Sequence, residues 1–236
     1  MNLILLEEKD FSGPDHVRIT GQRFIHVKKV IKPGNNSILT CGMVNGKMGT
    51  GTLLSMDRQG FEMKVNLVDD PPPPLPLTLV MALPRPKMLK RILQSLASLG
   101  VKDIYLINSW RVEKSFWKSD VLDSDRLERH LRLGLAQAKD TQMPRVHLRR
   151  YFTPFVQEEI ESISRGKVLV LAHPKSVQPC PVGVNKQTVL VIGPEGGFIE
   201  KEISAFVRMG FESFTLGPRI LRVETAVTAL VSRLFT

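Results

Sequence analysis

Residues 189–198 read VLVIGPEGGF, a short apolar run that ends abruptly in a turn containing Gly193, Pro194 and Gly197. Four to eight apolar residues bounded by glycine and proline are typical of a buried strand in a parallel sheet. Two similar stretches stand on either side of it in the sequence, VLVLAHP at 168–174 and FTLGPR at 214–219. We therefore expect three strands whose turns meet at the carboxyl edge of one sheet, where ligands of such folds bind.

Apolar runs alternate with helical patterns over residues 77–236. Further strand-like runs occupy 77–83 and 104–107, and apolar stripes with helical spacing lie at 89–99, 127–138, 203–207 and 227–234. This alternation predicts an α/β fold with a mostly parallel sheet. The stripes are expected to form its core, with no further role assigned to them.

The segment 71–76 reads PPPPLP and should be an extended linker, because proline fixes φ and lacks a backbone donor. The part before it consists of short apolar runs punctuated by turn residues, at 17–19, 24–27, 37–41, 51–56 and 61–65. These runs predict a small β-barrel. We accordingly divide the chain into a barrel at 1–70, a linker at 71–76 and an α/β domain at 77–236.

The composition favours a nucleic-acid partner. The formal net charge is +10, an excess of cations that attracts a polyphosphate before any specific contact forms. The barrel region supplies the basic residues that we expect to contact RNA phosphates: Arg18, Arg23, Lys28, Lys29 and Lys32.

Other classes of protein are disfavoured. No apolar stretch has the length of a membrane span, and the first residues lack the basic start and long apolar run of a signal peptide. Cys41 and Cys180 stand apart, with no CxxC and no histidine cluster near them, so we expect neither a structural metal nor a disulfide framework. A reducing cytoplasm fits this pattern.

The usual nucleotide-binding signals are missing, since the chain contains neither GxGxxG nor GxxxxGK[ST]. Glu195, Glu200 and Glu202 also surround the Gly196-Gly197 turn, and this negative charge disfavours a phosphate there. The turns therefore favour a ligand that carries positive charge or is held mainly by backbone groups.

Two segments resemble the signatures of the RsmE family in the SPOUT superfamily: VIGPEGGF at 191–198 followed by Glu202-Ile203, and LGPRILRVETA at 216–226. Shorter matches are ALP at 82–84, LGV at 99–101, HP at 173–174 and KPG at 32–34, with His26 and Val30. The resemblance implies a PUA-like N-terminal barrel and a C-terminal domain with a deep trefoil knot. It also implies a homodimer whose active site includes the partner subunit.

For function, the resemblance implies methylation of uridine N3 in 16S ribosomal RNA, on free RNA or the small ribosomal subunit, with S-adenosylmethionine as the methyl donor. The donor would lie against Leu171, His173, Ile192, Gly193, Pro194, Gly197, Leu216, Gly217 and Leu221. Glu224 would accept the N3 proton and Arg222 would stabilise charge on the ring oxygens. Arg219 is expected to contact RNA. Three plainer roles stay open: a surface residue that caps a turn for His173, a helix-start charge for Glu224 and a phosphate contact for Arg222.

The chain departs from the family pattern outside the three turns. Residues 136–140 read AQAKD where the family reads EQxGR, and Ser95 and Ser98 replace a lysine and a glutamate. Lys114 and Val223 replace the usual arginine and threonine. These changes predict altered RNA recognition and leave two alternatives: the same chemistry on another nucleotide or RNA, or an RNA-binding protein that keeps the fold without turnover.

Overall fold

The computed structural model describes residues 2–34 and 36–235. It divides into two compact units. Unit 1 comprises Met1–Pro73 with Arg132–Met143, and unit 2 comprises Pro74–Leu131 with Pro144–Thr236. The first boundary lies in the proline-rich segment. The inclusion of residues 132–143 in unit 1 has no counterpart in the local sequence pattern.

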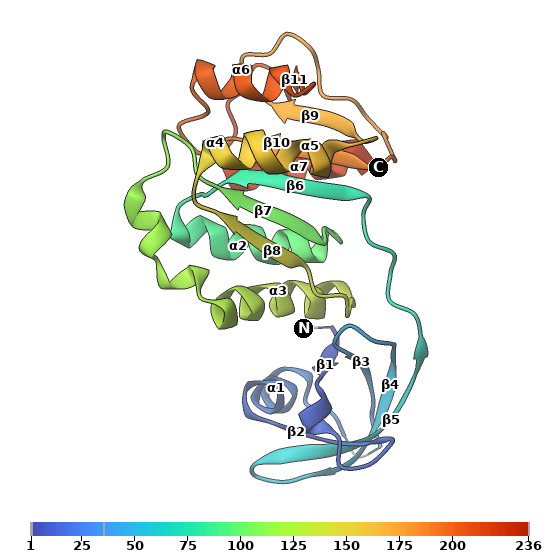
Figure 1. Ribbon diagram of the computed structural model, residues 1–236. Helices are drawn as coiled ribbons and strands as arrows, with labels where there is room; N and C mark the ends of the chain where they lie inside the picture. Colours follow the sequence, from blue (N-terminus) through green and yellow to red (C-terminus); the bar gives the residue numbers. More distant parts are fainter. Residues whose placement is uncertain (1, 35, 236) are drawn as a thin grey trace. The chain divides into compact units, whose positions relative to one another are not determined.

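In the described part of unit 2, six parallel strands form one sheet in the order β11-β9-β10-β6-β7-β8 (Figure 1). Their bounds are β6 (Leu77–Ala82), β7 (Asp103–Ile107), β8 (Arg145–Arg149), β9 (Val168–Ala172), β10 (Thr188–Ile192) and β11 (Glu212–Phe214). Every residue of β6 and β10 is buried, as expected for strands covered on both faces. The predicted α/β class with a mostly parallel sheet is confirmed.

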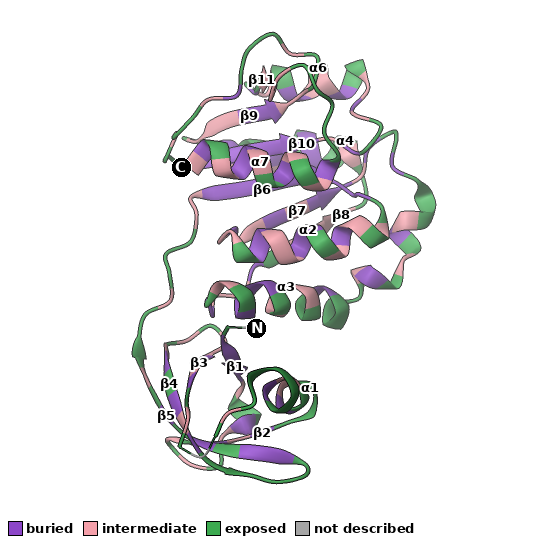
Figure 2. Ribbon diagram, turned by 180° about the vertical axis from the view of Figure 1, so that it is seen from behind, coloured by how far each residue is buried: buried purple, intermediate pink, exposed green. Residues whose placement is uncertain are grey.

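Helices cover both faces of this sheet (Figures 1 and 2). The helices α2 (Pro86–Ser98) and α7 (Val223–Phe235) lie on one face, and α4 (Phe152–Pro154), α5 (Ile160–Ser164) and α6 (Glu200–Arg208) lie on the other. The remaining helical segments of unit 2 are Lys114–Lys118, Asp120–Leu122, Phe155–Glu159 and the first half of α3 (Ser124–Ala138).

An aromatic cluster anchors α6. The ring of Phe206 is fully buried, and its centroid lies 5.5 Å from those of Phe152, Phe198 and Phe211. Because Phe198 belongs to the turn after β10, this packing fixes the position of that turn relative to the helix that follows it.

In the described part of unit 1, five strands form a curled sheet in the order β1-β3-β4-β5-β2. The strands are β1 (Ile4–Leu6), β2 (His16–Thr20), β3 (Ile38–Met43), β4 (Met48–Met56) and β5 (Gly60–Asp69). A short 3-10 segment at Glu8–Asp10 lies between β1 and β2. All pairs are antiparallel except β1 with β3. Its core contains Ile19, Phe61 and Met63, each fully buried.

One predicted strand of this unit is wrong. The run 24–27 is helical, since α1 (Gly21–His26) continues directly into a helical segment at Val27–Ile31. Phe24 and Val27 are buried whereas Ile25 and Val30 are exposed. Burial at a spacing of three residues is the signature of one helix face, and a four-residue apolar run does not distinguish it from a strand.

The segment 132–143 is bound to unit 1 by backbone hydrogen bonds. The carbonyl oxygen of Ala136 accepts the N–H groups of Asn2 and Leu3 at 2.8 and 2.9 Å. The Thr141 hydroxyl donates to the carbonyl oxygen of Gly46 at 2.6 Å, and Asp140 is buried. Residues 136–140, where the family resemblance fails, therefore contribute to the packing of unit 1.

Candidate functional site

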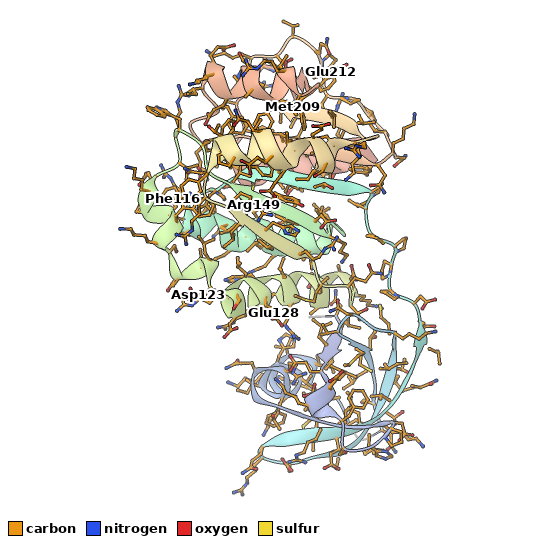
Figure 3. All side chains as sticks on the ribbon, in the orientation of Figure 1. Phe116, Asp123, Glu128, Arg149, Met209 and Glu212 are labelled. Atoms are coloured by element: carbon orange, nitrogen blue, oxygen red, sulfur yellow. The ribbon has the colours of Figure 1, made fainter. Side chains whose placement is uncertain are left out.

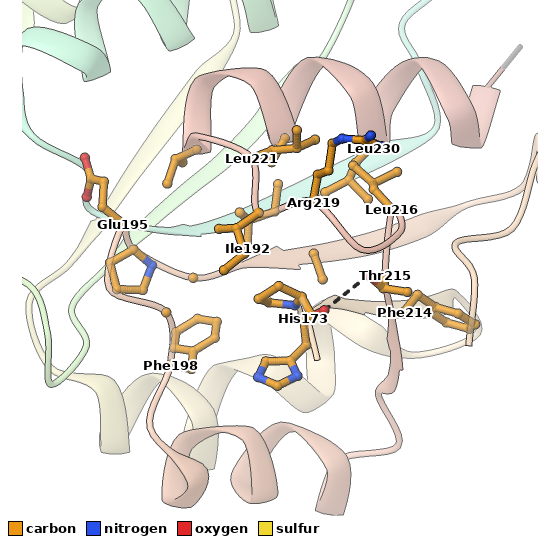
Figure 4. Close-up of a pocket in the computed structure, with 18 residues that line it drawn as sticks. His173, Ile192, Glu195, Phe198, Phe214, Thr215, Leu216, Arg219, Leu221 and Leu230 are labelled. Carbon is orange, nitrogen blue, oxygen red and sulfur yellow. Dashed lines mark hydrogen bonds between the residues drawn. The ribbon is translucent and has the colours of Figure 1, made fainter. Parts of the chain in front are cut away.

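The three turns that follow β9, β10 and β11 enclose a pocket (Figure 4). Its volume is about 730 Å³, counting the space open to solvent. Eight of the residues named from the sequence line it: His173, Ile192, Gly193, Pro194, Gly197, Leu216, Leu221 and Arg219. The structure thus brings together residues that lie up to 48 positions apart, from 173 to 221.

Local hydrogen bonds define the shape of the turns. Gly197 has a φ of +73°, and its N–H donates to the Pro194 carbonyl at 2.8 Å. Gly217 has a φ of +118°, and its N–H donates to the Thr215 hydroxyl at 3.2 Å. The same hydroxyl lies 3.4 Å from the Pro174 carbonyl oxygen, the dashed contact in Figure 4. Thr215 therefore connects the first turn to the third.

The pocket is mostly apolar, with few charged groups. Burial is the main reason that the pKa of His173 lies below its usual value, so this ring is neutral at pH 7. Arg219 lies beside α7, and the exposed Glu195 accepts the backbone N–H of Arg85 at 3.0 Å. Such a surface suits a ligand with an apolar body that is oriented by backbone groups.

Four of the residues expected to bind the cofactor or to act in catalysis do not line the pocket. The Leu171 side chain is fully buried in β9, and because side chains alternate along a strand, its neighbour Ala172 faces the pocket instead. Gly217 shapes the third turn. Arg222 is exposed immediately before α7, and Glu224 is half-buried in the first turn of that helix.

Sequence reasoning missed about half of the lining: Ala172, Pro174, Glu195, Phe198, Phe214, Thr215, Ile220, Val223, Ala226 and Leu230. The helix α7 carried the available signal, because Val223, Ala226 and Leu230 have helical spacing and share one face. The apolar stripe at 227–234 was expected to be core, and its Leu230 is core and pocket lining at once, since it is 1% exposed and lines the pocket.

The basic residues of unit 1 differ in their surroundings. Arg23 donates to both carboxylate oxygens of the buried Asp10 at 2.6 and 2.7 Å, and Arg18 pairs with Asp57 and Glu62. Lys29 and Lys32 are exposed, and the Lys28 ammonium lies 5.2 Å from the Phe24 ring centre. Arg23 thus has a structural partner, whereas the lysines are open to solvent.

No group of three His, Cys, Asp or Glu residues within 2–34 and 36–235 is placed to hold a metal ion. No helix in the same ranges is long and apolar enough to cross a membrane. Cys41 and Cys180 are both buried and unpaired with each other, and burial raises the pKa of Cys41 to about 12.

Comparison with known proteins now identifies the fold. A family model described as an RNA methyltransferase domain matches residues 71–235. Ribosomal RNA small subunit methyltransferase E of Treponema pallidum is 28% identical over 235 residues, covering 97% of this chain and 88% of the relative. Ribosomal RNA small subunit methyltransferase E 1 of Borreliella burgdorferi is 26% identical over 232 residues, covering 97% and 95%.

A solved structure agrees with these relatives. The Neisseria gonorrhoeae ribosomal RNA small subunit methyltransferase E bound to S-adenosyl methionine superposes with a TM-score of 0.74 at 21% identity, covering 98% of this chain and 95% of that one. The resemblance to the RsmE family is confirmed, and the matched segment includes the whole pocket. The chain belongs to the RNA methyltransferase domain family.

Proposed function

We propose that this chain transfers the methyl group of S-adenosylmethionine to N3 of a uridine in small-subunit ribosomal RNA. The observation that carries the proposal is the pocket at the three turns, lined by His173, Gly193 and Leu216 within a segment that matches an RNA methyltransferase domain. The relatives from Treponema pallidum and Borreliella burgdorferi are named for small-subunit ribosomal RNA.

The pocket fits S-adenosylmethionine on physical grounds. The lining offers apolar side chains such as Ile192 and Leu230 to an adenosine group, and backbone groups of the turns to its polar atoms. His173 is neutral at pH 7, so it adds no positive charge beside a sulfonium. When bound, the donor supplies an activated methyl group.

The protein's own task is to align the acceptor and to remove its proton. Holding two reactants in line can contribute roughly 7 to 11 kcal/mol in favourable cases. Uracil N3 is protonated at neutral pH, so a base must accept that proton during transfer, and a carboxylate can do this. Glu224 is the carboxylate nearest in sequence to the pocket-lining Val223 and Ala226, and Arg222 precedes it. We assign them the roles of proton acceptor and charge stabiliser.

The test is to map N3-methyluridine in small-subunit ribosomal RNA from cells with and without this gene. Loss of one modified site in the deletion, restored by the intact gene, supports the proposal. Binding of S-adenosylmethionine without any lost modification would favour a non-catalytic RNA-binding protein. The proposal includes a homodimer, and a molecular mass measured by light scattering tests it.

A separate prediction concerns RNA binding by unit 1. Lys28→Ala and Lys29→Ala should each weaken RNA binding at low salt. Each should also reduce the slope of log affinity against log salt by up to about 1, because fewer counterions are released from the RNA when one phosphate contact is lost. Fluorescence titration at several salt concentrations measures both quantities. Arg23→Ala should instead lower the melting temperature, since it leaves the buried Asp10 carboxylate without its partner. Unchanged salt slopes in both lysine variants would remove this surface from RNA recognition.

A further inference from the structure

Unit 2 contains a second cavity, on the other side of the turn that follows β10. Phe198 lines the first pocket, and the next residue, Ile199, lines the second. The second cavity has about 1760 Å³ when measured in the same way, more than twice the first. Its lining residues come from three segments, 108–114 after β7, 152–157 after β8, and 199–209. Met209, the last of them, is labelled in Figure 3.

A buried hydroxyl in this cavity lacks a partner. Ser109 is only 3% exposed, and its Oγ forms no hydrogen bond with any residue that the structure describes. Leaving a buried hydroxyl unpaired is costly, so such groups usually have a hydrogen-bond partner, which can be a ligand or water. Ser109 lines the cavity, which makes a polar ligand atom its natural partner.

The cavity is also electropositive. Lys114, Lys201 and Arg208 line it, and none of them forms an ion pair within the described ranges. Among the described lining residues, Glu202 is the sole carboxylate. Its two oxygens are already engaged, accepting the backbone N–H groups of Trp110 at 2.8 Å and Ile199 at 3.0 Å. The three cations are therefore available to an anionic ligand.

An exposed aromatic side chain completes the cavity. Trp110 lines it and is 79% exposed, although its backbone is fixed by Glu202. Aromatic side chains beside basic groups are the usual platform for single-stranded nucleic acid, because every base has a face that can stack. A protein partner fits less well, since the centres of protein interfaces are depleted in lysine and other charged groups.

We propose that this cavity binds one nucleotide of single-stranded RNA, with its base against Trp110 and its phosphate near Lys201 and Arg208. The Ser109 hydroxyl would bond a polar atom of the same nucleotide. The inference rests on the proposed function, because it supplies the same RNA substrate with a second contact beside the methyl-transfer pocket.

The experiment uses the full-length protein and a short, fluorescently labelled oligouridylate. Trp110→Ala, and separately the double variant Lys201→Ala/Arg208→Ala, should weaken its binding about tenfold or more, as expected for loss of a stacked base or of phosphate contacts. The matched control is Arg165→Ala/Lys186→Ala, which removes the same charges from exposed positions before β9 and β10. The control should change affinity much less, and S-adenosylmethionine binding should be unchanged in every variant.

Two results overturn the cavity site: normal RNA affinity in Trp110→Ala, or equal losses in the two double variants. A changed oligomeric mass beside normal RNA affinity in Trp110→Ala would identify the surface as a protein contact instead. Melting temperatures confirm that the variants are folded. Methylation of ribosomal RNA by the unaltered protein is measured in parallel. If it occurs while the variants bind RNA normally, the cavity inference fails alone. If it does not occur but RNA binding depends on Trp110, the proposed function fails alone.

Discussion

Glu224→Gln should slow methyl transfer to ribosomal RNA by about 100-fold or more, because general bases typically contribute that much to a reaction. Glutamine keeps the size and most of the hydrogen bonding of glutamate but cannot accept the N3 proton. The affinity for S-adenosylmethionine should stay the same, since Glu224 does not line the pocket. Single-turnover kinetics beside a cofactor titration separates these two quantities.

A matched variant distinguishes chemistry from helix electrostatics. Asp125 is a carboxylate in the first turn of α3, as Glu224 is in the first turn of α7, but Asp125 is exposed and Glu224 is half-buried. Asp125→Asn should therefore lower helix stability by about 0.3–1 kcal/mol, an amount similar to that expected for Glu224→Gln, and leave turnover normal. Near-normal turnover in Glu224→Gln would reduce Glu224 to the same helix-start role and leave proton removal to solvent or to a partner subunit.

Gly217→Val should weaken S-adenosylmethionine binding roughly 10- to 100-fold. Gly217 has a φ of +118°, a region that β-branched residues avoid, and forcing a side chain into it costs on the order of 1–3 kcal/mol. A Cβ there would meet nothing within 4 Å, so the effect must come from the backbone of the third turn rather than from a clash. Isothermal calorimetry measures the affinity.

The control is Gly166→Val, because Gly166 has a φ of +71° and equally open surroundings. Gly166 lies just before β9, at the amino ends of the strands, whereas the pocket lies at their carboxyl ends. Gly166→Val should lower the melting temperature and keep the affinity. Gly193→Val tests the space directly, since its Cβ would lie 3.1 Å from both the ring and the backbone nitrogen of Phe198. Normal affinity in both Gly193→Val and Gly217→Val would exclude this pocket as the cofactor site.

The sequence predicts the centre of the unit 2 sheet well for a physical reason. Strand β10 is buried throughout and is therefore an almost continuous apolar run, and glycine and proline mark where it ends. Strand β8 escapes the same reasoning because Arg145–Arg149 reads RVHLR, whose alternation resembles an exposed segment. The short apolar run 24–27 is compatible with the spacing of a strand or of a helix, and only tertiary packing makes it a helix.

The candidate sites also differ in how far the sequence predicts them. Residues in local turns, such as Gly193 and Gly197, are recognisable because each turn has its own sequence signature. The second cavity is not, since Ser109, Gln157 and Arg208 come from three separate segments and only the fold places them together. Glu202 was visible as an acidic residue near a turn, but its hydrogen bond to Trp110 spans 92 positions.

The hydrogen bonds from Asn2 and Leu3 to Ala136 determine when unit 1 can be completed during synthesis. These two residues, which directly precede β1, must wait until more than half of the chain has been synthesised before their amide groups find this acceptor. Contacts of such large sequence separation slow folding, because the intervening loop must close first. A nascent or recombinant fragment that stops at the proline-rich segment should consequently expose apolar surface and aggregate.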